Sequence, residues 1–151
     1  MHTPEFGFAT PDDLSALCDL LEELFTLERD FEPAREKQLA GLGLILDNPG
    51  MGRLFVVRVQ GEVVGMANGL ITISTAQGGP VLLLEDVILG KEHRGTGLGR
   101  LLVEHVLAWA AAEGMTRVTL LADRANAPAL AFYARLGFEE SAMTVLRKTL
   151  E

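Results

Sequence analysis

The sequence predicts one α/β (α+β) domain over residues 1–151, with a mixed sheet flanked by about four helices. A length of 151 residues suits a single domain. Apolar runs typical of strands are interspersed with segments of helical periodicity. A glycine-rich loop at 94–99 follows a strand-like run and opens a helix. Together these observations predict strands and helices that share one core.

The N-terminal part predicts a short strand at 6–9 followed by two helices. Thr10 can cap the first helix, Pro11 suits its first turn, and two aspartates follow, where the helix dipole favours negative charge. Apolar residues at helical spacing continue to Phe25 and form one helix face. A second helix is expected from about 33 to 46. It ends there because the following Pro49-Gly50 cannot continue a helix.

The middle of the chain predicts three strands. Gln60-Gly61-Glu62 forms a tight turn between strands at 54–59 and 63–74, and a third strand is expected at 81–89. No charged residue occurs from 63 to 84, but glycines and polar residues interrupt this stretch. We therefore expect strands and no membrane span.

The remaining elements are a helix at 98–113, a strand at 117–122, a helix at 126–136 and one or two last strands within 138–148. Gly114 and Gly137 end the two helices. The full expectation is a mostly antiparallel sheet of six to seven strands in the order βααβββαβαββ.

Charge and composition exclude several classes of function. The formal net charge is −8, and binding to nucleic acid requires a basic surface, so no nucleic-acid partner is expected. Cys18 is the only cysteine, which excludes a disulfide within the chain and fits a reducing compartment. No basic segment followed by an apolar run begins the sequence, so a cytoplasmic location is expected.

The glycine-rich loop has the features of an anion site. Glycines let backbone N–H groups converge, and the N-terminus of the following helix adds positive partial charge. The segment 91–100 carries a local charge of +2 within an acidic chain. Thr96 stands where a nucleoside-triphosphate loop needs lysine, and the G-x-G-x-G spacing does not fit a dinucleotide fingerprint. A turn without a ligand remains the alternative for the loop taken alone.

A second group of residues sharpens this interpretation. The chain contains N-x-P-A-x-x-F-Y-x-x-x-G-F from Asn126 to Phe138, and its only tyrosine, Tyr133, shares a helix face with Asn126. With the strand at 85–89 and the Arg94-Gly95-Thr96-Gly97-Leu98-Gly99 loop, this pattern resembles the GNAT superfamily of acyl-CoA-dependent N-acyltransferases.

The resemblance implies acetyl-CoA as co-substrate. The loop backbone would bind the pyrophosphate, the strand end would pair with the pantetheine arm, and Asn126 would hydrogen-bond that arm. Tyr133 would lie near the thioester sulfur. The cofactor-binding residues implied are Val87, Ile88, Leu89, Arg94, Gly95, Thr96, Gly97, Leu98, Gly99, Arg100, Asn126 and Tyr133.

Amine acetylation needs a base and an acid. An alkyl amine has a pKa near 10.4, so it must lose a proton before it attacks a thioester, and a carboxylate can accept that proton. Glu85 is the preferred base; Asp86 and a chain of waters are the alternatives. Strand alternation predicts that the two carboxylates point to opposite faces. Tyr133 is the expected acid for the leaving thiolate.

The acceptor is expected at the connection between the first two helices. In this family these helices build part of the acceptor site, and Phe25, Glu28, Asp30 and Phe31 would bind a cationic amine. A solvated charged turn is the alternative for any one of these residues. Three histidines and one cysteine give no metal-ligand cluster, so no metal is expected.

The sequence therefore predicts an acetyl-CoA-dependent N-acetyltransferase that modifies a primary amine of a small molecule by direct attack in a ternary complex. The alternatives are an acetyltransferase of protein N-termini or lysines, and a non-catalytic acyl-CoA-binding module. A homodimer could form through pairing of the 144–146 segment at a sheet edge.

Overall fold

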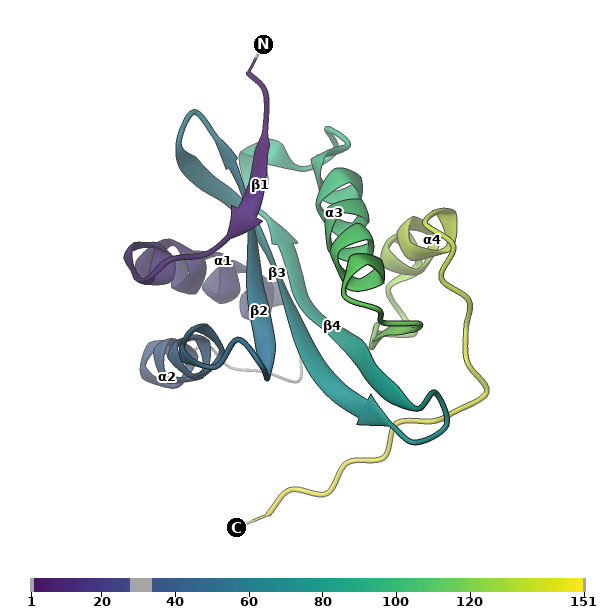
Figure 1. Cartoon of the computed structure of the whole chain (residues 1–151). Coiled ribbons are helices and arrows are strands. Elements are labelled where there is room, and N and C mark those ends of the chain that lie inside the picture. Colours follow the sequence, from purple (N-terminus) through teal and green to yellow (C-terminus); the bar gives the residue numbers. More distant parts are fainter. Residues whose placement is uncertain (1, 28–33, 151) are drawn as a thin grey trace. The chain divides into compact units, whose positions relative to one another are not determined.

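The computed structural model of the chain describes residues 2–27 and 34–150. It divides into two compact units, residues 1–121 and 122–151, and each is described by itself. The first unit contains the sheet with three of the helices, and the second contains the last helix (Figure 1).

The sheet of the first unit is mixed. Among the residues described it has five strands in the order β1-β2-β3-β4-β5. The strands are β1 (Glu5–Phe8), β2 (Gly52–Val59), β3 (Glu62–Ser74), β4 (Gly79–Leu89) and β5 (Val118–Leu120). Neighbours from β1 to β4 are antiparallel, whereas β5 runs parallel to β4. A tight turn joins β2 to β3, where Gln60 and Gly61 both have positive φ, as expected for a two-residue hairpin.

Helices cover both faces of this sheet (Figure 1). On one face lie α1 (Leu14–Leu27), which follows a short 3-10 turn η1 (Pro11–Asp13), and α2 (Arg35–Asp47). Leu54 and Val56 of β2 belong to the core cluster on this side. Their neighbour Phe55 points the other way, where its ring contacts His105 and Trp109 of α3 (Leu98–Ala112). The alternation of side chains along β2 thus builds both halves of the core.

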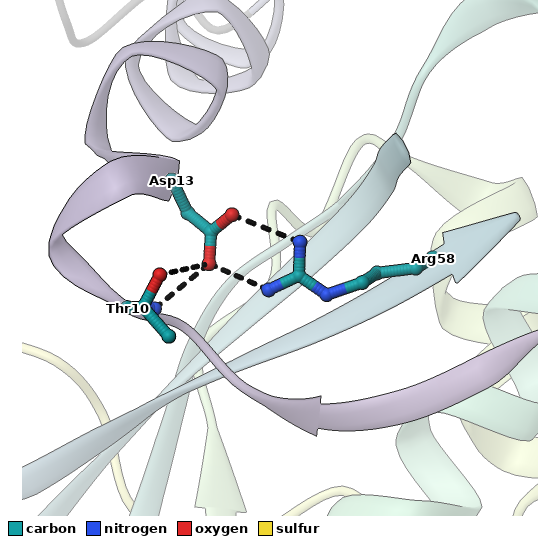
Figure 2. Close-up of polar contacts among 3 residues, drawn as sticks. All are labelled: Thr10, Asp13 and Arg58. Carbon is teal, nitrogen blue, oxygen red and sulfur yellow. Dashed lines mark hydrogen bonds and ion pairs between the residues drawn. The ribbon is translucent and has the colours of Figure 1, made fainter. Parts of the chain in front are cut away.

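A partly buried ion pair stabilises the chain just before α1 (Figure 2). Arg58 of β2 donates from both terminal nitrogens to Asp13, at 2.9 Å and 2.6 Å. The Thr10 backbone N–H donates to the same carboxylate at 2.7 Å. This hydrogen bond stabilises the first turn that the sequence predicts after Thr10. One aspartate therefore joins the first helix to the second strand.

Several sequence predictions are confirmed with shifts of one or two residues. The helix expected at 98–113 spans Leu98–Ala112, and Gly114 ends it with a φ of +83°. Cys18 is fully buried in the core cluster, and burial raises the pKa of its thiol. The predicted helix at 126–136 is α4 (Ala127–Arg135) of the second unit.

The number of strands was predicted wrongly. We expected a mostly antiparallel sheet of six to seven strands; the sheet is mixed, and residues 139–150 form no strand in the part of the chain described. Val145 and Leu146 are 57% and 91% exposed. A short apolar segment with a β-branched residue favours a strand, but a strand requires a partner backbone, and the local sequence does not supply one.

Candidate active site

The candidate site of the first unit begins at an open edge of β4. β5 pairs with β4 only at Leu82–Leu84, so among the described residues no strand covers this edge from Glu85 onward. Gly90 donates its N–H to Val64 in β3. The backbone of the preceding residue, Leu89, therefore points to the opposite, open edge. An extended ligand with amide groups can add to such an edge like a further strand.

The glycine-rich loop follows directly and leads into α3. After the 3-10 turn η2 (Lys91–His93), Gly95 and Gly97 have φ values of +72° and +85°. This left-handed conformation favours glycine, and a Cβ at either position would meet no atom within 4 Å. Gly97 is the N-cap of α3, and no side chain caps the helix there. The first N–H groups of α3 therefore remain available for an anion such as a pyrophosphate.

The arginines of this segment have protein partners. Arg94 donates from Nε to the Leu89 carbonyl at 2.9 Å and forms an ion pair with Glu23 of α1 at 3.4 Å. Arg100 pairs with Glu104 one turn later in α3. Because both guanidinium groups already face carboxylates, the backbone amides of the loop are the better anion-binding groups. Arg94 joins the loop to the end of β4.

Glu85 and Asp86 lie at a β-bulge. Met66 pairs with Ile88 and Asn68 pairs with Glu85, so β4 contains one residue more than β3 between these two pairs. Asp86 has a φ of +51°. Its carboxylate accepts a hydrogen bond from Asn68 Nδ2 at 2.6 Å, and Asn68 is the register partner of Glu85. The prediction that alternation separates the two carboxylates was wrong, because the bulge interrupts alternation and both residues lie beside Asn68.

Asn68 was not predicted as a site residue. Only 3% of it is exposed, and its Oδ1 has no hydrogen-bond partner among the residues described. The one signal in the sequence is an amide side chain within an apolar strand, which we interpreted only as evidence against a membrane span.

The second unit carries Asn126 and Tyr133. Asn126 is the N-cap of α4, and its Oδ1 accepts a hydrogen bond from the Ala129 N–H at 3.2 Å. The Tyr133 ring packs edge-on against Phe132 and Phe138. Burial raises the pKa of Tyr133 above its ordinary value of 10. The phenol is thus protonated at neutral pH and able to donate.

The expected acceptor residues fall largely outside the structural description. Glu28, Asp30 and Phe31 lie outside the described residues; Phe25 belongs to α1, but its side chain is not described. Across residues 2–27 and 34–150, no three His, Cys, Asp or Glu side chains gather as metal ligands. In the same residues no helix has the length and apolar character needed to cross a membrane.

Known proteins with similar sequences are acetyltransferases. The profile of the acetyltransferase (GNAT) family matches residues 14–138. Streptothricin acetyltransferase from Streptomyces lavendulae is 34% identical over 87 residues, which cover 57% of this chain and 44% of that protein. Glucosamine 6-phosphate N-acetyltransferase from Trypanosoma brucei brucei is 28% identical over 128 residues, 83% of this chain and 82% of that one. The chain thus spans less than half the length of the first of these relatives.

The fold agrees with the sequence comparison. The crystal structure of a possible acetyltransferase from Clostridium difficile 630 has a TM-score of 0.90, at 21% identity and with 98% of each chain covered. The chain belongs to the acetyltransferase (GNAT) family. Members of this family use acetyl-CoA as the acetyl donor.

Proposed function

We propose that this protein transfers the acetyl group of acetyl-CoA to a primary amine of a small, cationic molecule by direct attack in a ternary complex. The observation that carries the proposal is the open edge of β4 followed directly by a loop with two left-handed glycines and an uncapped helix N-terminus. The pantetheine arm would pair with the backbone of Val87 and Leu89, and the pyrophosphate would bind the N–H groups of the loop.

The reaction requires one proton acceptor. In the proposed mechanism Glu85, directly or through water, takes a proton from the substrate ammonium so that its nitrogen can attack the acetyl carbon. Backbone N–H groups of the open edge stabilise the oxyanion that forms at the carbonyl. Glu85 is half-buried beside the bulge, which supports this role over that of a fully solvated carboxylate.

The reaction also requires a proton donor. When the C–S bond breaks, CoA leaves as a thiolate, and Tyr133 gives it a proton. Burial raises the pKa of the Tyr133 phenol, so the phenol is protonated at the pH of the reaction and has a proton to donate. The substrate ammonium loses two protons in all: Glu85 accepts the first and passes it to solvent, and the second, lost from the nitrogen after it attacks, replaces the proton that Tyr133 gave to the thiolate. The products are the N-acetylated amine, CoA and one released proton.

The acceptor class rests on two observations. The names of the two sequence relatives each specify a small molecule, streptothricin and glucosamine 6-phosphate. Residues 28–32 hold three acidic residues and one arginine, which favours a cationic acceptor. Phe25, Glu28, Asp30 and Phe31 are the proposed acceptor-binding residues. We further propose a cytoplasmic protein, consistent with its single, buried cysteine, and a homodimer.

Substituting the two proposed proton-transfer residues tests this mechanism. We expect Tyr133→Phe and Glu85→Gln each to lower kcat by about 10- to 1000-fold, whereas the dissociation constant of acetyl-CoA changes by less than about threefold. Steady-state thiol release and calorimetric titration with acetyl-CoA measure the two quantities. An unchanged kcat for Tyr133→Phe would remove the acid assignment, and an unchanged kcat for Glu85→Gln would remove the base assignment.

A further inference from the structure

The bulge in β4 combines two unfavourable features at one place. Asp86 adopts a left-handed backbone conformation, and the only other described non-glycine residue with positive φ, Gln60, lies in a hairpin turn. Asn68 next to it is buried with an unpaired oxygen in the described structure. Leucine at position 68 would avoid the second of these penalties. Such features beside the proposed base point to a functional requirement rather than to stability.

The hydrogen bond between the two residues has a defined direction. Asn68 donates from Nδ2 to the Asp86 carboxylate, so its Oδ1 takes no part in this hydrogen bond. Asn68 is itself held by β3, between Leu54 of β2 and Glu85 of β4 in the register. A rigid central strand thus holds the side chain of the bulge residue through a short hydrogen bond of 2.6 Å.

The position of Asp86 explains why this bond matters. Asp86 lies between Glu85, the proposed base, and Val87, the first residue proposed to pair with the acetyl-CoA arm. A change in the backbone at Asp86 would rotate the peptide groups on both sides. Fixing this one residue therefore orients both the carboxylate that takes the proton and the backbone that binds the acetyl-CoA arm.

We propose that Asn68 and Asp86 form a positioning pair, in which the buried Asn68 amide holds the Asp86 carboxylate and thereby keeps β4 in the bulged conformation that acetyl transfer requires. Neither residue exchanges a proton with substrate. The inference rests on the proposed function and adds two positioning residues to it.

Three substitutions test the pair. Asn68→Leu keeps the volume but removes the donor, Asp86→Gly keeps the left-handed backbone but removes the acceptor, and Asp86→Asn keeps both the hydrogen bond and tolerance of positive φ while removing the charge. We expect the first two to lower kcat at least tenfold with the acceptor amine that gives the fastest thiol release, and Asp86→Asn to retain kcat within threefold of wild type.

Stability separates positioning from a general structural role. Urea unfolding should show that Asn68→Leu still unfolds cooperatively, since losing the unpaired oxygen offsets part of the lost hydrogen bond to Asp86. Met66→Leu, one register step away on the same buried face, is the matched control and should leave kcat unchanged. If kcat is unchanged in Asp86→Gly, or if Asp86→Asn loses as much activity as Asp86→Gly, the positioning pair is wrong; the second result would make the charge of Asp86 essential.

These experiments distinguish an error in the proposed function from an error in the proposed positioning pair. If wild type releases no thiol with any amine, the proposed function is wrong, and the pair is then judged by the dissociation constant of acetyl-CoA from calorimetry. A rise of at least fivefold in Asn68→Leu, with Asp86→Asn near wild type, supports the pair. Equal dissociation constants in all three proteins overturn it.

Discussion

At the scale of single residues, Asp13 has the clearest electrostatic role. Its carboxylate accepts two hydrogen bonds from Arg58 and one from the Thr10 backbone. The side-chain bond to Arg58 is the main cause that lowers the pKa of Asp13 below 3.8, against the opposing effect of burial. A group whose pKa is lower in the folded state binds fewer protons there than in the unfolded chain. The stabilisation by the Asp13 carboxylate is thus complete at a pH above its pKa in the unfolded chain. It is lost as the pH falls through its pKa in the folded protein.

Asp13→Asn should therefore lower the free energy of unfolding at pH 7 by about 1–3 kcal/mol, because Arg58 loses its charged partner. Urea unfolding at pH 7 and pH 3 measures the effect, and the difference from wild type should shrink at pH 3. Asp12→Asn is the matched control, since Asp12 is exposed, and it should change the free energy by less than about 0.5 kcal/mol. A difference between Asp13→Asn and wild type that is zero at pH 7, or equal at both pH values, contradicts the assignment.

At the scale of elements, the loop that leads into α3 depends on its backbone conformation. Gly97 has a φ of +85° with open space around a potential Cβ, so alanine there would be strained only through the backbone. We expect Gly97→Ala to lower the free energy of unfolding by about 1–2 kcal/mol and to weaken acetyl-CoA binding, because the N–H groups of the loop reorient. Thermal or urea unfolding and calorimetry with acetyl-CoA measure these effects.

The matched control is Gly43→Ala, in the middle of α2. A Cβ there also meets no atom within 4 Å, but the backbone is helical. This substitution should raise the free energy of unfolding by about 0.5–1 kcal/mol and leave acetyl-CoA binding unchanged. If Gly97→Ala behaved like Gly43→Ala, the loop would not require the left-handed conformation.

The sequence predicted the elements well wherever local rules decide structure. Capping residues, glycine stops and apolar periodicity placed α1, α3 and α4 within one or two residues. The bulge in β4 could not be predicted, because it depends on the register with β3 and not on the β4 sequence. Nothing local in Glu85-Asp86 indicates that a β3 side chain, Asn68, lies beside both. The prediction of strands within 138–148 was wrong for the same reason, since strand pairing depends on residues far away in the sequence.

In the candidate site, too, local features were predictable from the sequence and long-range contacts were not. The positive φ of Gly95 and Gly97 agrees with the glycine-rich loop expected from the sequence, because that backbone conformation favours glycine. The side-chain partners of Arg94 were not found, since Glu23 lies 71 residues away in sequence. Asn68 was seen only as a polar interruption of an apolar run, although burial makes it the more informative residue.

At the scale of the whole molecule, net charge describes the protein less well than its local distribution. The chain has a formal charge of −8, yet the segment 91–100 at the start of α3 is locally positive. Ion pairs of Arg94 and Arg100 reduce that positive charge, so the anion binding that we propose there would depend mainly on backbone dipoles. The segment 28–32, in contrast, is acidic, and in the proposed function it favours a cationic acceptor.

We propose that the protein transfers acetyl groups to amines rather than only binding acetyl-CoA. Thiol release from acetyl-CoA by the full chain, measured against a panel of polyamines, aminoglycosides, amino acids and lysine-containing peptides, tests this claim directly. We expect the fastest release with a small polycationic amine and slower or no release with peptides. Fastest release with peptides would indicate a protein acetyltransferase, and calorimetric binding of acetyl-CoA without thiol release for any amine would contradict the claim.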